Sequence, residues 1–157
     1  MKKITYINNN YINHNKAVVS VEDRGLLFSD SIYELISVFN SKIVDLNLHL
    51  KRLFISLKKI KIKPNFSKKK IETILKKLIK YNSLKNGYIY IQVTRGTSER
   101  KHEFPSNYKP TLIVFTKNLN IDEKIYKKGV KVITLPDLRW LRRDIKSTSL
   151  LPNILAK

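Results

Sequence analysis

The chain has 157 residues, of which 42% are hydrophobic and 28% charged, a balance typical of one globular core. It has no cysteine, which excludes disulfides and thiolate metal sites, and no apolar run approaches the roughly 18 residues that span a bilayer, so we expect a cytoplasmic protein with no membrane partner. The formal net charge of +20 would attract polyanions, yet 25 of the 32 basic residues are lysine and no recognised nucleic-acid motif accompanies them, so specific nucleic-acid binding is not predicted.

In the first third of the chain, the residue pattern predicts short strands and one helix. Residues 4–8, 11–12 and 17–21 are β-branched or aromatic and are separated by asparagine clusters, a pattern typical of antiparallel strands. Residues 30–39 are predicted to form a helix, because Asp30 can cap its start and apolar residues follow at helical spacing: Ile32, Leu35, Ile36 and Phe39. A further strand is expected at residues 42–44.

Two amphipathic helices are predicted next. The first follows Asp45 and ends before Pro64, which cannot continue a helix. The second begins after Ser67, a suitable cap, and carries one apolar stripe: Ile71, Ile74, Leu75, Leu78 and Ile79. Eleven lysines lie between residues 58 and 85, mostly on the opposite faces of these helices, where long ammonium side chains are usually just solvated.

The remaining elements are strands. From Gly87 the pattern has a period of two, with Ile89 and Ile91 on one side and polar or aromatic residues on the other. Residues 111–116 and 130–134 are predicted as further strands, and the lysine-rich residues 117–128 resemble a connector between two structural units. The pattern as a whole predicts an α+β fold with an antiparallel sheet.

One short segment carries the most specific functional signal. By position alone, none of the 25 lysines is singled out. However, residues 139–147, which read Arg-Trp-Leu-Arg-Arg-Asp-Ile-Lys-Ser, resemble the cofactor-lysine segment of D-amino-acid transaminases, the class-IV aminotransferases of fold type IV. The resemblance continues through residues 133–157 and back through most of the chain. It implies that Lys146 bonds to pyridoxal 5'-phosphate and is both the catalytic and a cofactor-binding residue, because an amine is needed for this chemistry.

The same resemblance assigns further residues. Arg52 matches the arginine that binds the cofactor phosphate, a role that suits a guanidinium because it can donate two hydrogen bonds to one phosphate. His49 lies one turn earlier on the same face. Without the resemblance, both would be read as surface groups of an amphipathic helix.

A third set concerns the substrate. Arg100 and His102 are two residues apart, so in an extended segment both project to one side and can donate to one carboxylate. Composition alone favours a solvated charged loop here. The resemblance implies instead that Arg100, His102 and Tyr33 hold the substrate carboxylate, in a trap assembled across the interface of a homodimer.

The chain departs from the family pattern at three positions. Ser29 and Ser31 stand where relatives usually carry small residues, glycine or alanine at the first and glycine at the second, which could alter a close backbone approach. Arg143 stands where many relatives have cysteine and adds a positive charge near Lys146 in sequence.

The resemblance also implies a domain organisation and a reaction. Residues 1–118 would form the small N-terminal domain, and residues 119–157 the connector and the start of a larger, truncated cofactor-binding domain. The reaction would transfer the amino group of a D-amino acid, such as D-alanine, to a 2-oxo acid, such as 2-oxoglutarate. Two alternatives stay open: a branched-chain aminotransferase or aminodeoxychorismate lyase of the same fold, and a non-catalytic fragment with weak polyanion binding.

Overall fold

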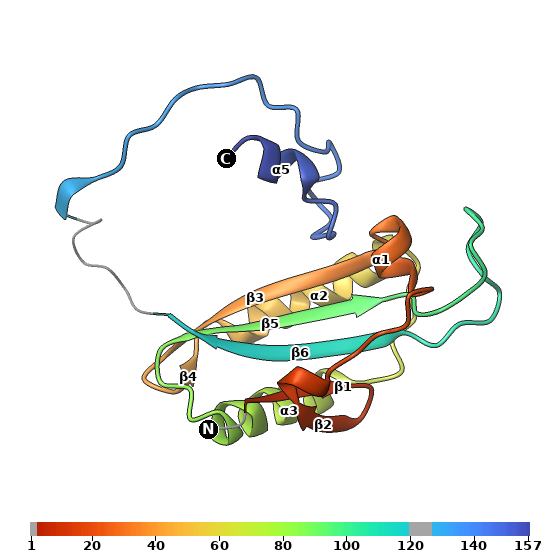
Figure 1. The fold of residues 1–157 in the computed structure, drawn as a ribbon, viewed down its shortest axis with the longest axis horizontal. Coiled ribbons are helices and arrows are strands. Elements are labelled where there is room, and N and C mark those ends of the chain that lie inside the picture. Colours follow the sequence, from red (N-terminus) through yellow and green to blue (C-terminus); the bar gives the residue numbers. More distant parts are fainter. Residues whose placement is uncertain (1–2, 120–126) are drawn as a thin grey trace.

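The computed structural model describes residues 3–119 and 127–157. Within them, six strands form one antiparallel sheet in the order β2-β1-β6-β5-β3-β4 (Figure 1). The strands are β1 (Ile4–Ile7), β2 (Asn10–Asn13), β3 (Ser31–Phe39), β4 (Lys42–Ile43), β5 (Gly87–Thr94) and β6 (Thr111–Asn118). The helices are the 3-10 helix η1 (His14–Lys16) and the α-helices α1 (Arg24–Phe28), α2 (Leu46–Lys59), α3 (Lys68–Tyr81) and α5 (Leu151–Leu155). This architecture confirms the predicted α+β class.

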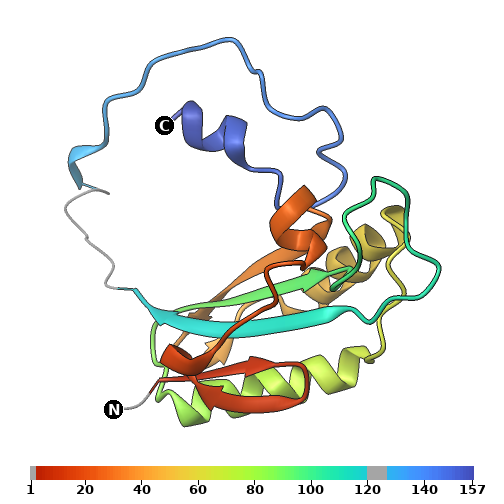
Figure 2. The ribbon, with the colours of Figure 1, turned by 45° about the vertical axis from the view of Figure 1, so that its right-hand side comes forward.

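The core lies between the sheet and two helices. In Figures 1 and 2, α2 and α3 cover the same face of the sheet, with α2 behind β3 and β5 and α3 beside β1 and β2. The fully buried apolar residues come from both layers: Leu53, Leu57, Ile71, Leu75 and Leu78 from the helices, and Ile32, Ile36, Ile89, Ile91 and Val114 from the strands. Both amphipathic helices are therefore confirmed, and the lysines of α3 lie exposed on its outer face. None of the described helices combines the length and apolarity needed to cross a membrane.

The helix α3 begins with the cap that the sequence predicts. Ser67 has extended backbone angles, and its hydroxyl accepts a hydrogen bond from the backbone N–H of Lys70. Replacing Ser67 with alanine should therefore lower the free energy of unfolding by about 1 kcal/mol, as for other N-caps. The measurement is urea denaturation followed by circular dichroism. Ser98→Ala, in an exposed hydrogen bond to the neighbouring carbonyl, is the matched control; equal midpoints for the two variants would contradict the capping role.

The helix predicted at residues 30–39 is wrong, because this segment forms the central strand β3. Ile32 and Ile36 satisfy both a helical and a strand pattern, since they are four residues apart. The actual period is two: Ile32, Glu34 and Ile36 are buried against the helices, while Leu35 is exposed. Pairing along the whole length of β5 decides the outcome, as tertiary context often does for short apolar runs.

Two predicted strands are also wrong. Residues 17–21 form a loop that enters a turn, with Val18 and Val21 more than three-quarters exposed. Residues 130–134 are irregular and exposed, and in Figure 1 this stretch arcs away from the sheet. Strand propensity measures the fit to a half-buried pleated surface, and these segments have no such surface beside them among the described residues. Residues 120–126 of the predicted connector lie outside the described residues.

Candidate active site

The site is built where the C-terminal segment returns to the sheet. The first half of β3 has one open edge, because β4 pairs only with residues 38–39 of that strand. Residues 144–148 lie along this open edge, and Figure 2 shows the chain returning beside α1 and β3. The backbone N–H of Tyr33 donates to the carbonyl of Lys146 at 3.0 Å. This lysine is therefore fixed to the sheet through its own main chain.

Further contacts hold the same segment from both sides. Ile145 is buried in the core, and the backbone N–H of Lys146 donates to the hydroxyl of Ser56 on α2 at 3.3 Å. On the sheet, the Thr148 and Ser31 hydroxyls form a hydrogen bond of 2.5 Å, and the Gln92 amide also donates to Ser31. The segment is thus clamped between α2 and β3.

The Lys146 side chain points at Tyr33. Its Nζ donates to the phenol oxygen at 3.2 Å and lies 4.3 Å from the ring centroid. Both residues line a cavity of about 280 Å³. The other residues of its wall include Arg52, Arg139, Trp140, Arg143, Asp144, Ser147, Ser149 and Asn153. The structure therefore brings together three of the predicted residues, Lys146, Tyr33 and Arg52.

Arg52 is held by a carboxylate that the sequence analysis did not single out. Glu34 is completely buried, and its two oxygens accept from Nε and Nη2 of Arg52 at 2.7 and 2.6 Å. Nδ1 of His49 lies 2.8 Å from the same carboxylate. The hydrogen bond to Glu34 raises the pKa of Arg52, so the guanidinium stays charged. Half of the Arg52 side chain remains exposed.

Charged residues flank the lysine segment. The carboxylate of Asp144 accepts from Arg142 at 3.1 Å and from Lys59 at 2.7 Å. These hydrogen bonds, first that of Arg142 and then that of Lys59, hold the pKa of Asp144 below its usual range. Arg143 lines the cavity as well, but its guanidinium pairs with Asp137 at 2.7 Å. The surroundings of Lys146 are therefore rich in cations and suit an anionic ligand.

Arg100 and His102 lie elsewhere, around the ring of Phe28. The guanidinium carbon of Arg100 is 5.2 Å from the ring centroid, and the His102 ring meets Phe28 edge to face at 5.5 Å. Their segment is bent and exposed, not an extended strand. Both residues do approach one aromatic ring, but neither lines the cavity that contains Lys146.

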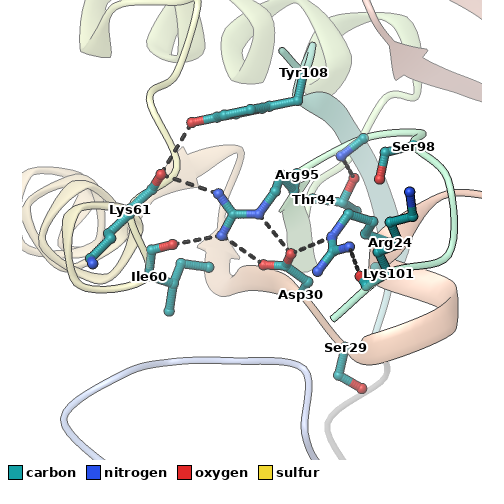
Figure 3. Close-up of polar contacts among 12 residues, drawn as sticks. Arg24, Ser29, Asp30, Ile60, Lys61, Thr94, Arg95, Ser98, Lys101 and Tyr108 are labelled. Carbon is teal, nitrogen blue, oxygen red and sulfur yellow. Dashed lines mark hydrogen bonds and ion pairs between the residues drawn. The ribbon is translucent and has the colours of Figure 1, made fainter. Parts of the chain in front are cut away.

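A buried ionic cluster anchors the loop that carries this pair (Figure 3). The carboxylate of Asp30 accepts from Arg24 at 2.8 Å and from Arg95 at 2.7 and 3.0 Å. Arg24 also donates to the carbonyl of Lys101 at 2.6 Å. Lys101 lies in the sequence between Arg100 and His102, the two residues predicted to bind the substrate. In Figure 3, Asp30 lies between the two guanidinium groups, and Arg95 reaches on to the carbonyls of residues 60 and 61.

The two serine departures have structural consequences. Ser29 has a φ of 54° in the left-handed region and ends α1, a conformation that glycine adopts without strain. Ser31 is completely buried, and its hydroxyl provides the bond to Thr148 described above. A glycine at this position would lack that hydroxyl. The departure at Ser31 therefore adds a contact to the lysine segment.

Sequence reasoning missed the residues that hold the site residues in place. Glu34 carried a detectable signal, because it is a carboxylate between the apolar Ile32 and Ile36 on the buried face of β3; buried carboxylates need partners. Asp30 was interpreted as a helix cap and serves instead as the centre of an ionic cluster. Thr148 offered no signal, because its partner is 117 residues away.

The chain is similar in sequence to known proteins. The model of the amino-transferase class IV family matches residues 31–157. The chain is 40% identical over 153 residues to a D-alanine aminotransferase of Staphylococcus epidermidis, covering 97% of this chain and 54% of that protein. It is 39% identical over 158 residues to the D-alanine aminotransferase of Staphylococcus aureus, covering all of this chain and 56% of that protein.

A solved structure shows the same fold. The chain superposes on the 4-amino-4-deoxychorismate lyase from Pseudomonas aeruginosa with a TM-score of 0.78 at 23% identity, over 97% of this chain and 55% of that one. The chain spans about half the length of the curated relatives that it matches. The family match covers well over half of the 157 residues, and the chain therefore belongs to the amino-transferase class IV family.

Proposed function

We propose that this chain carries the lysine half of a pyridoxal-phosphate-dependent D-amino-acid aminotransferase. The observation that supports the proposal best is the position of Lys146: its amine faces Tyr33 on the wall of a cavity that Arg52 also lines. Because the chain spans about half of its curated relatives, the proposal for the chain itself is covalent attachment of the cofactor at Lys146. It also includes one half-reaction, in which the amino group of a D-amino acid passes to the cofactor held at Lys146.

The residues present fit the cofactor. The Lys146 amine is half-buried and accessible from the cavity, and the Arg52 guanidinium keeps N–H groups free for a phosphate after pairing with Glu34. Bound pyridoxal phosphate would supply an aldehyde for the lysine amine and a ring that withdraws electrons from the substrate carbon. Arg52 would hold the phosphate through two parallel hydrogen bonds.

Lys146 has two tasks in this proposal. Its amine holds the cofactor until the substrate amino group displaces it, and the freed Nζ then moves the proton of the substrate α-carbon. The main-chain bonds of the segment to Tyr33 and Ser56 keep that amine in place during the exchange. The Tyr33 phenol, 3.2 Å from Nζ, is close enough to orient it.

Arg100 and His102 would bind the substrate carboxylate of a neighbouring subunit. Neither lines the cavity of its own Lys146, as expected if the pair serves the partner of a homodimer. In this arrangement residues 1–118 form the small domain, and residues 119–157 form the connector and the start of the cofactor-binding domain. The proposed location is the cytoplasm, and D-alanine with 2-oxoglutarate is the proposed substrate pair.

The proposal is tested by one half of the transamination reaction, in which an amino acid gives its amino group to the bound cofactor and leaves as a 2-oxo acid. The purified chain is mixed with pyridoxal phosphate, freed of excess cofactor, and incubated separately with D-alanine, L-alanine and L-leucine, and the 2-oxo acids are measured by mass spectrometry. Pyruvate from D-alanine alone is the expected result. A 2-oxo acid from L-leucine and none from D-alanine would instead indicate a branched-chain aminotransferase. No cofactor bond at Lys146 together with salt-sensitive retention on nucleic acid would indicate the non-catalytic alternative.

A separate prediction concerns the carboxylate pair. Replacing Arg100 with glutamine should reduce pyruvate formation from D-alanine by about tenfold or more, since a charge-assisted hydrogen bond contributes about 1.5–3 kcal/mol. Cofactor attachment at Lys146 should be unchanged. Lys109→Gln removes a charge from the same loop and serves as the control. Equal D-alanine reactivity of Arg100→Gln and this control would contradict the assignment.

A further inference from the structure

Glu34 is an unusual residue for its place in the fold. It alternates with Ile32 and Ile36 on the face of β3 that packs against the helices, and its side chain is completely buried. A buried carboxylate loses its hydration, and an apolar residue of similar volume would often be at least as stable there. Stability alone therefore does not explain a charge at this position.

The partners of Glu34 reach it from α2, on the side of the candidate cavity. Arg52 approaches side-on, so that the two carboxylate oxygens accept from Nε and Nη2. His49, one helical turn earlier, contacts the same carboxylate at 2.8 Å. The bonds fix the plane of the guanidinium, which otherwise ends a long and flexible side chain with about half of its surface exposed.

This pairing leaves one edge of the guanidinium for a ligand. Arginine has five N–H groups, and the two hydrogen bonds to Glu34 use the one on Nε and one of those on Nη2. Nη2 also lies 3.3 Å from Nδ1 of His49, so the two N–H groups of Nη1, on the other edge of the fork, remain for a ligand. Arg52 lines the cavity that also contains Lys146.

We propose that Glu34 is a positioning residue that holds Arg52 so that its remaining edge receives the cofactor phosphate. The inference rests on the proposed function, because it assumes that pyridoxal phosphate occupies the cavity. Beyond the proposed function, it assigns part of the affinity for the phosphate group to Glu34, which acts through Arg52 and does not contact the phosphate itself. His49 contacts Oε2 of Glu34, the same oxygen that accepts from Nη2 of Arg52, and limits the movement of the carboxylate.

The sign of the effect separates positioning from simple charge. Glu34→Gln removes a negative charge close to the phosphate site, and on electrostatic grounds alone the anion should bind more tightly. Positioning gives the opposite result. Glutamine has only one side-chain oxygen, so it cannot accept from both Nε and Nη2, and the guanidinium of Arg52 is no longer held in one plane. We expect the dissociation constant for pyridoxal phosphate to rise about tenfold, as when partners that orient metal ligands are lost.

The experiment compares two ligands that differ only in the phosphate. Wild type, Glu34→Gln and Glu72→Gln are titrated with pyridoxal phosphate and with pyridoxal, and the fraction bonded to Lys146 is quantified by peptide mapping after borohydride reduction. Glu72 is paired with Lys76 on the exposed face of α3, so its variant is a control with the same change in charge. Weaker binding of pyridoxal phosphate by Glu34→Gln alone, with pyridoxal unchanged, is expected. Unchanged or tighter binding of pyridoxal phosphate, or an equal loss for both ligands, would overturn the inference.

Two further measurements complete the test. In the Arg52→Lys background, Glu34→Gln should have no additional effect, because its effect passes through Arg52; an additive effect would refute the inference. If Glu34→Gln fails to fold, the NMR signal of the Arg52 Nε–H in the wild-type protein is measured instead. Without ligand, this signal should be resolved and the proton protected from exchange with solvent. Protection that arises only after pyridoxal phosphate is added would overturn the inference. Wild type that bonds neither ligand at Lys146 would instead refute the proposed function itself.

Discussion

Replacing Lys146 with arginine should eliminate the covalent attachment of pyridoxal phosphate to this segment. Arginine keeps the positive charge and much of the length, but its guanidinium is never a free amine at neutral pH, so it cannot bond to the aldehyde or carry the proton. Loss of a positioned proton carrier alone lowers a rate by about 10²–10⁴-fold, and loss of the covalent step adds to this. The measurement is the borohydride-stable incorporation of cofactor, read together with the formation of pyruvate from D-alanine.

The control for this prediction must account for the many other lysines. Lys76→Arg changes a lysine that pairs with Glu72 on the surface of α3, and it should leave both measurements at their wild-type values. If Lys146→Arg and Lys76→Arg incorporate equal amounts of cofactor, the attachment is not specific to the candidate site. The segment would then be a structural remnant without its proposed role.

The largest expected effect on stability comes from Asp30. This carboxylate is 8% exposed and lies between the guanidiniums of Arg24 and Arg95, which are 3% and 1% exposed (Figure 3). Asp30→Asn would leave two buried cations facing each other without a counter-ion. Breaking a buried ion pair in this way costs about 3–5 kcal/mol, a large part of the roughly 5–15 kcal/mol that stabilises a typical domain. The midpoint of urea denaturation should therefore fall markedly.

Asp137→Asn is the matched control for Asp30→Asn. Asp137 also pairs with two arginines, Arg139 and Arg143, but these contacts lie at the surface, where solvent screens them. Its variant should unfold at the wild-type midpoint. The interpretation of the Asp30 cluster would be wrong if the two variants unfolded at the same urea concentration.

Helices and strands whose conformation is determined by their own residues could be predicted from the sequence. Those whose conformation depends on pairing with a distant segment could not. The helices α2 and α3 carry continuous amphipathic stripes, with a cap at Ser67, so their own residues identify them. For β3, the spacing of Ile32 and Ile36 fits both periods, and only the pairing with β5 selects the strand. Residues 17–21 show the converse, because β-branched residues with no neighbouring strand stay in a loop.

The same distinction applies to the candidate site. Lys146, Tyr33, Arg52, Arg100 and His102 were predicted because they occupy positions in a recognisable family pattern. The residues that orient them were not, because Glu34, Ser31 and Asp30 act through contacts with residues distant in sequence. A buried polar residue inside an apolar strand, such as Glu34, is the one signal of this kind that a sequence offers.

The most direct test of the account is to find which lysine bonds to the cofactor. The chain is incubated with less than one equivalent of pyridoxal phosphate, reduced with borohydride, digested with trypsin and mapped by mass spectrometry. Because trypsin does not cleave at a modified lysine, the account predicts one dominant modified peptide, which begins at Asp144 and reads through Lys146. Modification spread over the exposed lysines of α2 and α3, with Lys146 unmodified, would contradict it.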